Sequence, residues 1–203
     1  YVYDHMLTDK TEVYIETLGG TKHLWLETEN GIAVNIKADI GEPVLDTKVI
    51  PVNTGLGEFV EQPVTAGGIT LGITAVSWGN PHCVAFVEDT ASFDVHGIGR
   101  ELEYMTSLFP NKTNVTFAQV VSDSYIKMRE WERGTGETIG CGTGCATSVV
   151  AGVLTGRCKR HVSVEQIGGI LDINWNEEDN HLYMTGVSNT VFEAEIDISA
   201  VGK

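Results

Sequence analysis

Basic residues are scarce in this sequence, which has 13 Lys and Arg against 28 Asp and Glu and a formal net charge of -15 at pH 7. Such an acidic chain repels phosphate backbones and anionic lipids, so we expect neither nucleic acid nor a membrane surface as a partner. No apolar run approaches the roughly 20 residues that a bilayer span requires. Residues Tyr1 to His5 also lack the basic and apolar regions of a signal peptide. The sequence therefore predicts a cytoplasmic protein.

Cysteine is also sparse, with four residues at Cys83, Cys141, Cys145 and Cys158. They are too few and too unevenly spaced for a secreted disulfide framework in a chain of this length, so free thiols are expected. Cys141 and Cys145 have three residues between them, and no second pair has metal-ligand spacing. We therefore expect no metal site.

The chain has 203 residues, of which 42% are apolar, enough to bury a substantial core. Short runs of β-forming residues dominate, and helical patterns are expected only around Ile98 to Leu108 and from near Cys141 onward. Because strands and helices do not alternate regularly, the pattern favours an α+β fold over a doubly wound parallel sheet. The predicted strands are Glu12 to Thr17, His23 to Thr28, Ile32 to Ala38, Gly72 to Val76, Cys83 to Glu88, Val115 to Val121, Ser124 to Arg129, Val162 to Gln166, Ile170 to Trp175, Leu182 to Thr185 and Val191 to Ile198.

The first part of the chain has its own pattern. Tyr1 to Leu7 has aromatic and apolar residues at helical spacing and resembles the end of a helix. The first three strands form a predicted antiparallel meander, because Asn30-Gly31 between two β-runs is a strong hairpin signal. Pro43 then breaks the pattern and marks a candidate domain boundary.

The helix that begins near Cys141 offers the clearest chemistry. The sequence Gly140-Cys141-Gly142-Thr143-Gly144 leads directly into its first turn, where unpaired amides can bind a carboxylate or a phosphate. The same helix end lowers the pKa of a nearby thiol from about 8.5 toward roughly 3.5 to 7.5, which predicts partial thiolate character for Cys141. A tight turn with a buried structural cysteine explains the pentapeptide equally well, whereas a phosphate loop lacks its Lys-Ser/Thr ending.

Two further clusters contain candidate polar residues. Glu132-Arg133 could be a solvated surface pair, or a receptor in which Arg133 binds the carboxylate and Glu132 the ammonium of an amino acid head group. Asn80-Pro81-His82-Cys83 enters a strand, so His82 and Cys83 should face opposite sides of the sheet. A lone histidine is more often structural than catalytic, and composition does not decide between these roles.

Three segments together resemble the second half of the diaminopimelate epimerase family: Trp78 to Asp89, Asn111 to Phe117 and above all Trp131 to Ala146. Val13 to Gly20 and Asp39 to Pro43 also resemble segments of that family, so the likeness extends over essentially the whole chain. The resemblance implies a fold of mixed, mainly antiparallel strands wrapped around a central helix. It also implies cofactor-independent interconversion of LL- and meso-diaminopimelate in lysine and peptidoglycan precursor synthesis, with a small molecule as the partner.

The resemblance assigns roles to individual residues. Cys141 matches one of two thiol bases that remove and return the α-proton on opposite faces, and His82 and Glu132 match polar groups that support the catalytic thiols. Gly142 and Thr143 match the amides that hold the reacting carboxylate. The positions that hold the distal amino acid group are matched by Asn80, Asn114, Glu132 and Arg133. No cofactor and no metal are implied, and a homodimer is expected from the family alone.

The first-half Cys-Gly-Asn-Gly motif of that family would fall before Tyr1. We therefore expect residues 44 to 189 to form one complete domain, and residues 1 to 43 with the returning strand in 190 to 203 to form a remnant of its pseudo-symmetric partner. Such a chain would lack one base and be inactive alone. The alternatives are a proline or hydroxyproline racemase, disfavoured by Glu132-Arg133, and a non-catalytic amino-acid or anion binding module. An isomerase that uses a carboxylate in place of the thiol is disfavoured by Cys141.

Overall fold

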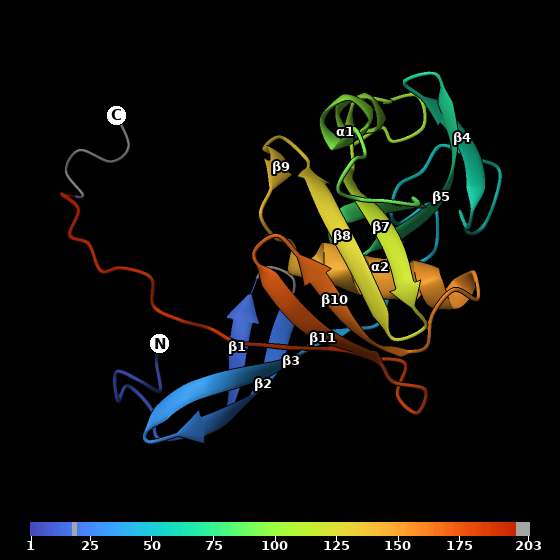
Figure 1. The fold of residues 1–203 in the computed structure, drawn as a ribbon. Helices are drawn as coiled ribbons and strands as arrows, with labels where there is room; N and C mark the ends of the chain where they lie inside the picture. Colours follow the sequence, from blue (N-terminus) through green and yellow to red (C-terminus); the bar gives the residue numbers. More distant parts are fainter. Residues whose placement is uncertain (18–19, 198–203) are drawn as a thin grey trace.

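The computed structural model describes residues 1–17 and 20–197, which form one 12-stranded sheet and two helices (Figure 1). The strand order is β1-β2-β3-β12-β11-β10-β8-β7-β6-β5-β4, and the short β9 pairs with β8 outside this path. Most neighbours are antiparallel, while β6–β7 and β8–β10 are parallel. The predicted α+β class is therefore confirmed.

The strands are β1 (Glu12–Thr17), β2 (Gly20–Glu29), β3 (Ile32–Gly41), β4 (Gln62–Ala66), β5 (Ile69–Ser77), β6 (Pro81–Phe86), β7 (Asn114–Ser122), β8 (Tyr125–Glu132), β9 (Gly136–Thr138), β10 (His161–Gln166), β11 (Gly169–Trp175) and β12 (Leu182–Gly186). The helices are α1 (Val95–Glu103) and α2 (Gly142–Leu154). Strands were therefore predicted close to their observed bounds, apart from β4, β9 and the last predicted run.

The first three strands form the predicted antiparallel meander. Its second turn contains Asn30 with φ 51° and Gly31 with φ 81°, the left-handed pair that a tight hairpin requires. The meander joins the rest of the sheet through β3, which pairs antiparallel with β12. In Figure 1 it lies at the lower left, beside the end of the sheet opposite to β4.

Helix α2 is the centre around which the strands wrap, because it contacts β5 to β8 and β10 to β12 (Figure 1). Ala146, Val149 and Val150 form one apolar stripe of α2, and the structure buries the opposite side as well, including Thr147 and Ser148. Both hydroxyls are satisfied within the helix, since they donate to the carbonyls of residues four positions earlier. The helix ends at Leu154 with Thr155 as its C-cap, followed by Gly156 with φ 71°.

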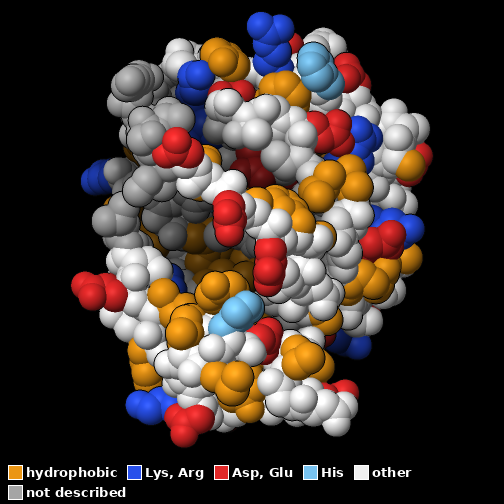
Figure 2. Space-filling view, turned by 90° about the vertical axis from the view of Figure 1, so that its left-hand side faces the viewer, with side chains coloured by type: hydrophobic (Ala, Val, Ile, Leu, Met, Phe, Trp, Pro, Cys, Tyr) orange, Lys and Arg blue, Asp and Glu red, His pale blue; other side chains and the backbone are white. Residues whose placement is uncertain are grey.

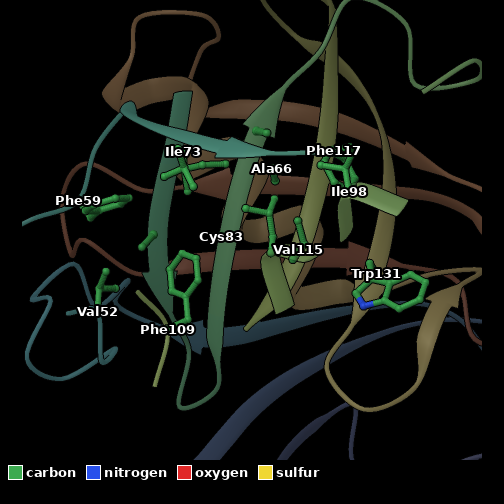
Figure 3. Close-up of a cluster of buried hydrophobic side chains, with 14 of the residues drawn as sticks. Val52, Phe59, Ala66, Ile73, Cys83, Ile98, Phe109, Val115, Phe117 and Trp131 are labelled. Carbon is green, nitrogen blue, oxygen red and sulfur yellow. The ribbon is translucent and has the colours of Figure 1, made fainter. Parts of the chain in front are cut away.

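Helix α1 covers a second group of buried side chains, shown in Figure 3, where Ile98, Phe117 and Trp131 lie close together. Asp94 caps the helix by accepting a hydrogen bond from the amide of Gly97 at 2.8 Å. The helix ends at Glu103, five residues before the predicted end at Leu108, because the chain continues as turns. Cys83 lies in this cluster and is fully buried.

Two expectations about individual elements are corrected, and two strands were not predicted. Tyr1 to Leu7 forms hydrogen-bonded turns without an α-helix. No strand forms in the described part of the run Val191 to Ile198, and Ile198 itself lies outside the described residues. The side chains of Val191 and Phe192 are 90% and 79% exposed, so no neighbouring strand covers these two residues. The sequence also missed β9 and the edge strand β4, where Pro63 conceals the signal.

Across the described residues, neither helix has the length and apolar character needed to cross a membrane. Figure 2 shows acidic side chains spread over one face of the molecule and hydrophobic side chains gathered around a hollow near its middle. This distribution agrees with the excess of acidic residues in the sequence.

Candidate active site

Cys141 is the N-cap residue of α2, with extended backbone angles of φ -141° and ψ 109°. Its side chain is half-buried, and its Sγ lies 3.4 Å from Oγ1 of Thr143 and within hydrogen-bonding reach of the Gly144 amide. Its own amide donates to Oε1 of Gln166 at 2.7 Å. These contacts hold the thiol at the positive end of the helix, as the glycine-rich motif predicted.

The expected low pKa of this thiol is wrong for the free site. Burial, and then the negative charge of Glu130, raise the pKa of the Cys141 thiol to about 11, despite the opposing hydrogen bonds from Thr143 and Gly144. The sequence argument considered only the helix end, and it omitted the carboxylate that the sheet brings beneath the same turn. Cys141 is therefore held as a thiol until that charge changes.

The other three thiols lie in different surroundings. Cys83 and Cys145 are fully buried, and burial raises the pKa of each thiol. Cys158 lies beyond the far end of α2, where its Sγ donates to the carbonyl of Val149 at 3.7 Å. That contact stabilises the protonated thiol, whereas the contacts of Cys141 stabilise a thiolate.

His82 is fully buried in β6, behind Cys141. Its Nε2 lies 3.1 Å from Nδ2 of Asn80 and 3.3 Å from Nδ2 of Asn114. The orientation of the Asn114 amide is set because its Oδ1 accepts a hydrogen bond from the Arg133 amide. Nε2 of His82 is therefore an acceptor, and the ring proton is on Nδ1. His82 and Cys83 face opposite sides of the sheet as predicted, since Cys83 lies in the α1 cluster.

The Nδ1 atom of His82 lies 3.4 Å from Oε1 of Glu130, and neither of these buried atoms has a hydrogen-bond partner within the described residues. Glu130 is also buried, and its Oε2 accepts a hydrogen bond from Oγ1 of Thr116 at 2.5 Å. Sequence reasoning missed this residue. The available signal was its position in β8, where Ile126, Met128 and Glu130 alternate on the buried face, so a charged residue occupies an apolar position.

Ligand-type atoms of His82, Glu130 and Cys141 lie within 4.8 Å of one another. A metal ion would need the Nδ1 lone pair of His82, because Nε2 is occupied by two amide groups. In the tautomer described above, Nδ1 carries the ring proton. The cluster therefore fits a proton-holding group better than a metal centre.

The predicted head-group residues lie on the neighbouring loop and strand ends. Glu132 ends β8 and its Oε1 accepts from Oγ1 of Thr138 at 2.7 Å. Arg133 is exposed, and its Nη1 donates to the carbonyl of Asn111 at 3.0 Å. Within the described residues, Arg133 makes no ion pair with Glu132, so neither charge is neutralised by the other.

The two predicted asparagines differ in exposure. Asn80 is half-buried and contacts His82. Asn114 is 6% exposed, and its Nδ2 also donates to the carbonyl of Pro81 at 3.1 Å. Both ends of its amide are thus bonded within the protein, so Asn114 links His82 to the backbone of Arg133.

The first turn of α2 supplies the remaining predicted residues. Gly142 and Thr143 are half-buried beside the thiol. Their amides belong to the first turn, where backbone N–H groups have no acceptor within the helix. This end of α2 can therefore hold an anion next to Cys141.

All eight predicted residues thus belong to one region around the N-terminus of α2 and the ends of β6, β7 and β8. The structure adds Glu130, Thr116 and Gln166 to that region.

Known proteins of one family resemble this chain in sequence. The family model described as diaminopimelate epimerase matches residues 74–191. A curated diaminopimelate epimerase of Methanococcus maripaludis is 46% identical over 98% of this chain and 71% of its own length. One from Acetivibrio thermocellus is 43% identical with the same coverage.

The fold comparisons reach more distant proteins. A probable proline racemase from Agrobacterium radiobacter superposes with a TM-score of 0.70 over 98% of this chain and 66% of its own, at 11% identity. A predicted epimerase from Pseudomonas aeruginosa gives 0.60 at 14% identity, over 93% of this chain and 71% of its own. At such identities these likenesses show the fold alone. The chain matches curated diaminopimelate epimerases at above 40% identity over 98% of its length. It therefore belongs to the diaminopimelate epimerase family.

Proposed function

We propose that the chain acts on diaminopimelate in the interconversion of its LL and meso forms, with Cys141 as one of the two thiol bases. The observation that carries this proposal is the position of Cys141: a half-exposed thiol at the N-cap of α2, beside the first-turn amides. A base and an anion site are thus one or two residues apart. Relatives at 41% to 46% identity over about 98% of the chain support diaminopimelate as the substrate.

The chemistry follows from this geometry. With the α-carboxylate of the substrate bound at the amides of Gly142 and Thr143, its α-carbon lies beside Sγ of Cys141. The Cys141 thiolate removes the α-proton, and the amides stabilise the negative charge that develops on the carboxylate. A thiol on the opposite face returns a proton, which inverts the centre.

The second head group of the substrate is proposed to bind at Glu132 and Arg133. The exposed guanidinium keeps further donors after its contact with Asn111, and can bind a carboxylate through two parallel hydrogen bonds. Glu132 binds the ammonium group, and Asn80 adds a polar contact. Asn114 holds the backbone of Arg133 in place.

A proline or hydroxyproline racemase is the second candidate, since that fold is shared. Proline has one carboxylate and no distal head group, so it leaves Glu132 and Arg133 without a partner. Close relatives named diaminopimelate epimerase favour the first candidate.

We also propose the wider organisation expected from the sequence. Every member of the two buried hydrophobic clusters lies between Ile50 and Leu182, which supports a domain over residues 44 to 189 with residues 1 to 43 and 190 to 203 outside it. A cytoplasmic location is supported by the four free cysteines. The homodimer stays a prediction.

The test is to incubate the purified chain with LL-diaminopimelate in D2O and resolve stereoisomers and α-deuterium together. We expect deuterium at the α-carbon without meso product. Cys83 and Cys145 are buried and Cys158 is at the far end of α2, so none of the other cysteines reaches the face opposite to Cys141. A single base that exchanges its proton with solvent gives retention.

The matched variants are Cys141→Ala and Cys158→Ala, which each remove one half-buried thiol. Loss of exchange in the first and not in the second supports the proposal. Exchange that survives Cys141→Ala, or no exchange in the unchanged chain, would contradict it. Rapid appearance of the meso form would show that another group in this chain supplies the second base.

A further inference from the structure

The protonation of Cys141 poses a chemical problem, because the proposed function needs a thiolate. Burial and a nearby carboxylate hold the proton on sulfur, whereas the hydroxyl of Thr143 and the amide of Gly144 are arranged to receive a negative charge. The site is thus prepared for a thiolate that the negative charge of Glu130 opposes. A protonated thiol in the free site and a thiolate during the reaction are both possible if the negative charge moves from Glu130 to Cys141.

Glu130 is held rigidly enough to take part in such an exchange. Thr116 donates to its Oε2, whereas its Oε1 lies 3.4 Å from Nδ1 of His82 without a hydrogen bond between the two atoms. A Cβ at residue 144 would lie 2.5 Å from Oε2, so the backbone of α2 can approach the carboxylate this closely only because residue 144 is glycine. Apart from the contact with His82, Oε1 of Glu130 makes no hydrogen bond within the described residues.

We propose that Glu130 and Cys141 share one proton and one negative charge, and that Glu130 releases the thiolate by accepting the thiol proton. This proposal rests on the proposed role of Cys141 as a base. In the step, the S–H bond of Cys141 breaks and its electron pair stays on sulfur, while an O–H bond forms on Glu130. The atoms lie within 4.8 Å, a separation that one hydrogen-bonded water spans. Glu130 is thus a positioning residue that does not touch the substrate.

The ionisable groups around Glu130 come from several elements. His82 faces Glu130 from β6. The negative charge of Glu130 raises the pKa of the thiols of Cys83, Cys141 and Cys145. Cys83 and Cys145 are fully buried, and burial keeps both thiols protonated. Glu132 contributes the smallest effect on Cys141. Cys141 is therefore the half-exposed thiol with which Glu130 can exchange a proton.

The test follows the rate of iodoacetamide alkylation of Cys141 against pH, with each cysteine mapped by mass spectrometry. The unchanged chain should give an apparent pKa of about 11 for Cys141. Glu130→Gln keeps the shape and removes the charge, and should lower this value by roughly one to two units, since a unit charge about 5 Å away has an effect of that order. Alkylation at neutral pH then accelerates about tenfold for each unit.

A second variant leaves Glu130 in place. Thr116→Val removes the hydroxyl that stabilises the carboxylate, which should favour transfer of the proton from the thiol and lower the apparent pKa of Cys141 by a smaller amount. This variant decides the question if Glu130→Gln does not fold. A purely structural role of Glu130 would not lower the thiol pKa in either variant.

Two matched controls come from α1 and from β5 of the same sheet. Glu103→Gln changes another buried glutamate, which binds Nε1 of Trp131. Thr74→Val removes a buried hydroxyl on β5, two strands from Thr116 in the register Thr74, Val84, Thr116. Neither should change the titration of Cys141.

The proposal is wrong if Glu130→Gln leaves the Cys141 titration within the range of the two controls, or raises it. If Glu130→Gln does not fold, the proposal is wrong when Thr116→Val leaves the Cys141 titration within the range of the two controls or raises it. Because these titrations use the chain without diaminopimelate, their failure is distinct from a failure of the proposed function, which is measured by α-deuterium and stereoisomers.

Discussion

The substitution Gly144→Ala tests how tightly α2 packs against Glu130. Alanine is favoured over glycine in a helix by about 1 kcal/mol, so the local effect alone would stabilise the protein. In this structure the new Cβ would lie 2.5 Å from Oε2 and 2.9 Å from Cδ of Glu130. Such contacts are closer than real Cβ atoms show, so the carboxylate or the helix must move.

The cost of that movement exceeds the helical gain. Overpacking a buried site costs about 1–3 kcal/mol. Displacing Glu130 also weakens its hydrogen bond from Thr116, and an unsatisfied buried group costs a further 1–3 kcal/mol or so. After subtraction of the helical term, Gly144→Ala should lower the free energy of unfolding by about 3 kcal/mol.

The matched control is Gly142→Ala, in the same first turn. Its Cβ would lie 2.9 Å from Sδ and 3.1 Å from Cε of Met184, the far end of a flexible side chain that can move aside. This variant should therefore be near neutral in stability. Urea unfolding followed by tryptophan fluorescence measures both free energies, and a thermal scan should show a difference of about 2–4 °C for each kcal/mol. If Gly144→Ala is as stable as Gly142→Ala or more so, the close approach of α2 to Glu130 is wrong.

Two further predictions concern ligand selectivity and pH. Arg133→Ala should weaken diaminopimelate binding by about tenfold to a hundredfold and leave binding of a monocarboxylic amino acid nearly unchanged, because the guanidinium serves the second head group. Equal losses for both ligands in calorimetric titrations would show that Arg133 does not bind the second head group specifically. The pKa of His181 is raised by its hydrogen bond to Asp39 at 2.8 Å. The resulting stabilisation is complete below the ordinary histidine pKa of 6.5 and is lost as pH rises through the higher folded-state value. Asp39→Asn should therefore cost a few tenths of a kcal/mol at about pH 5.5 and nothing at about pH 9; urea unfolding that shows the same cost at both pH values would contradict the pairing.

Local sequence information was sufficient for most of the elements and for the position of the Cys141 thiol. Asn30-Gly31 predicts the hairpin between β2 and β3 because its left-handed backbone angles depend on those two residues alone. Gly142 and Gly144 around Cys141 likewise place a thiol at a helix N-terminus. Both features depend on neighbours within a few residues, which the sequence displays directly.

The run Val191 to Ile198 shows where local information fails. Its residues favour a strand, yet a strand forms only beside a partner, and in the described part of this run the side chains are exposed and no pairing forms. Strand pairing depends on residues far apart in the chain. The β pattern alone therefore could not predict whether this strand forms.

The protonation of the site also depended on the tertiary structure. The sequence by itself determined that Cys141 lies at the N-terminus of α2 and that Glu132-Arg133 follows the neighbouring β-run. Only the packing of β6, β7 and β8 against α2 placed Glu130, His82 and Thr116 behind that thiol. Electrostatic energy depends on distance in space and on burial, neither of which a sequence displays. For this reason the helix end predicted a lowered thiol pKa, and the folded protein raises it.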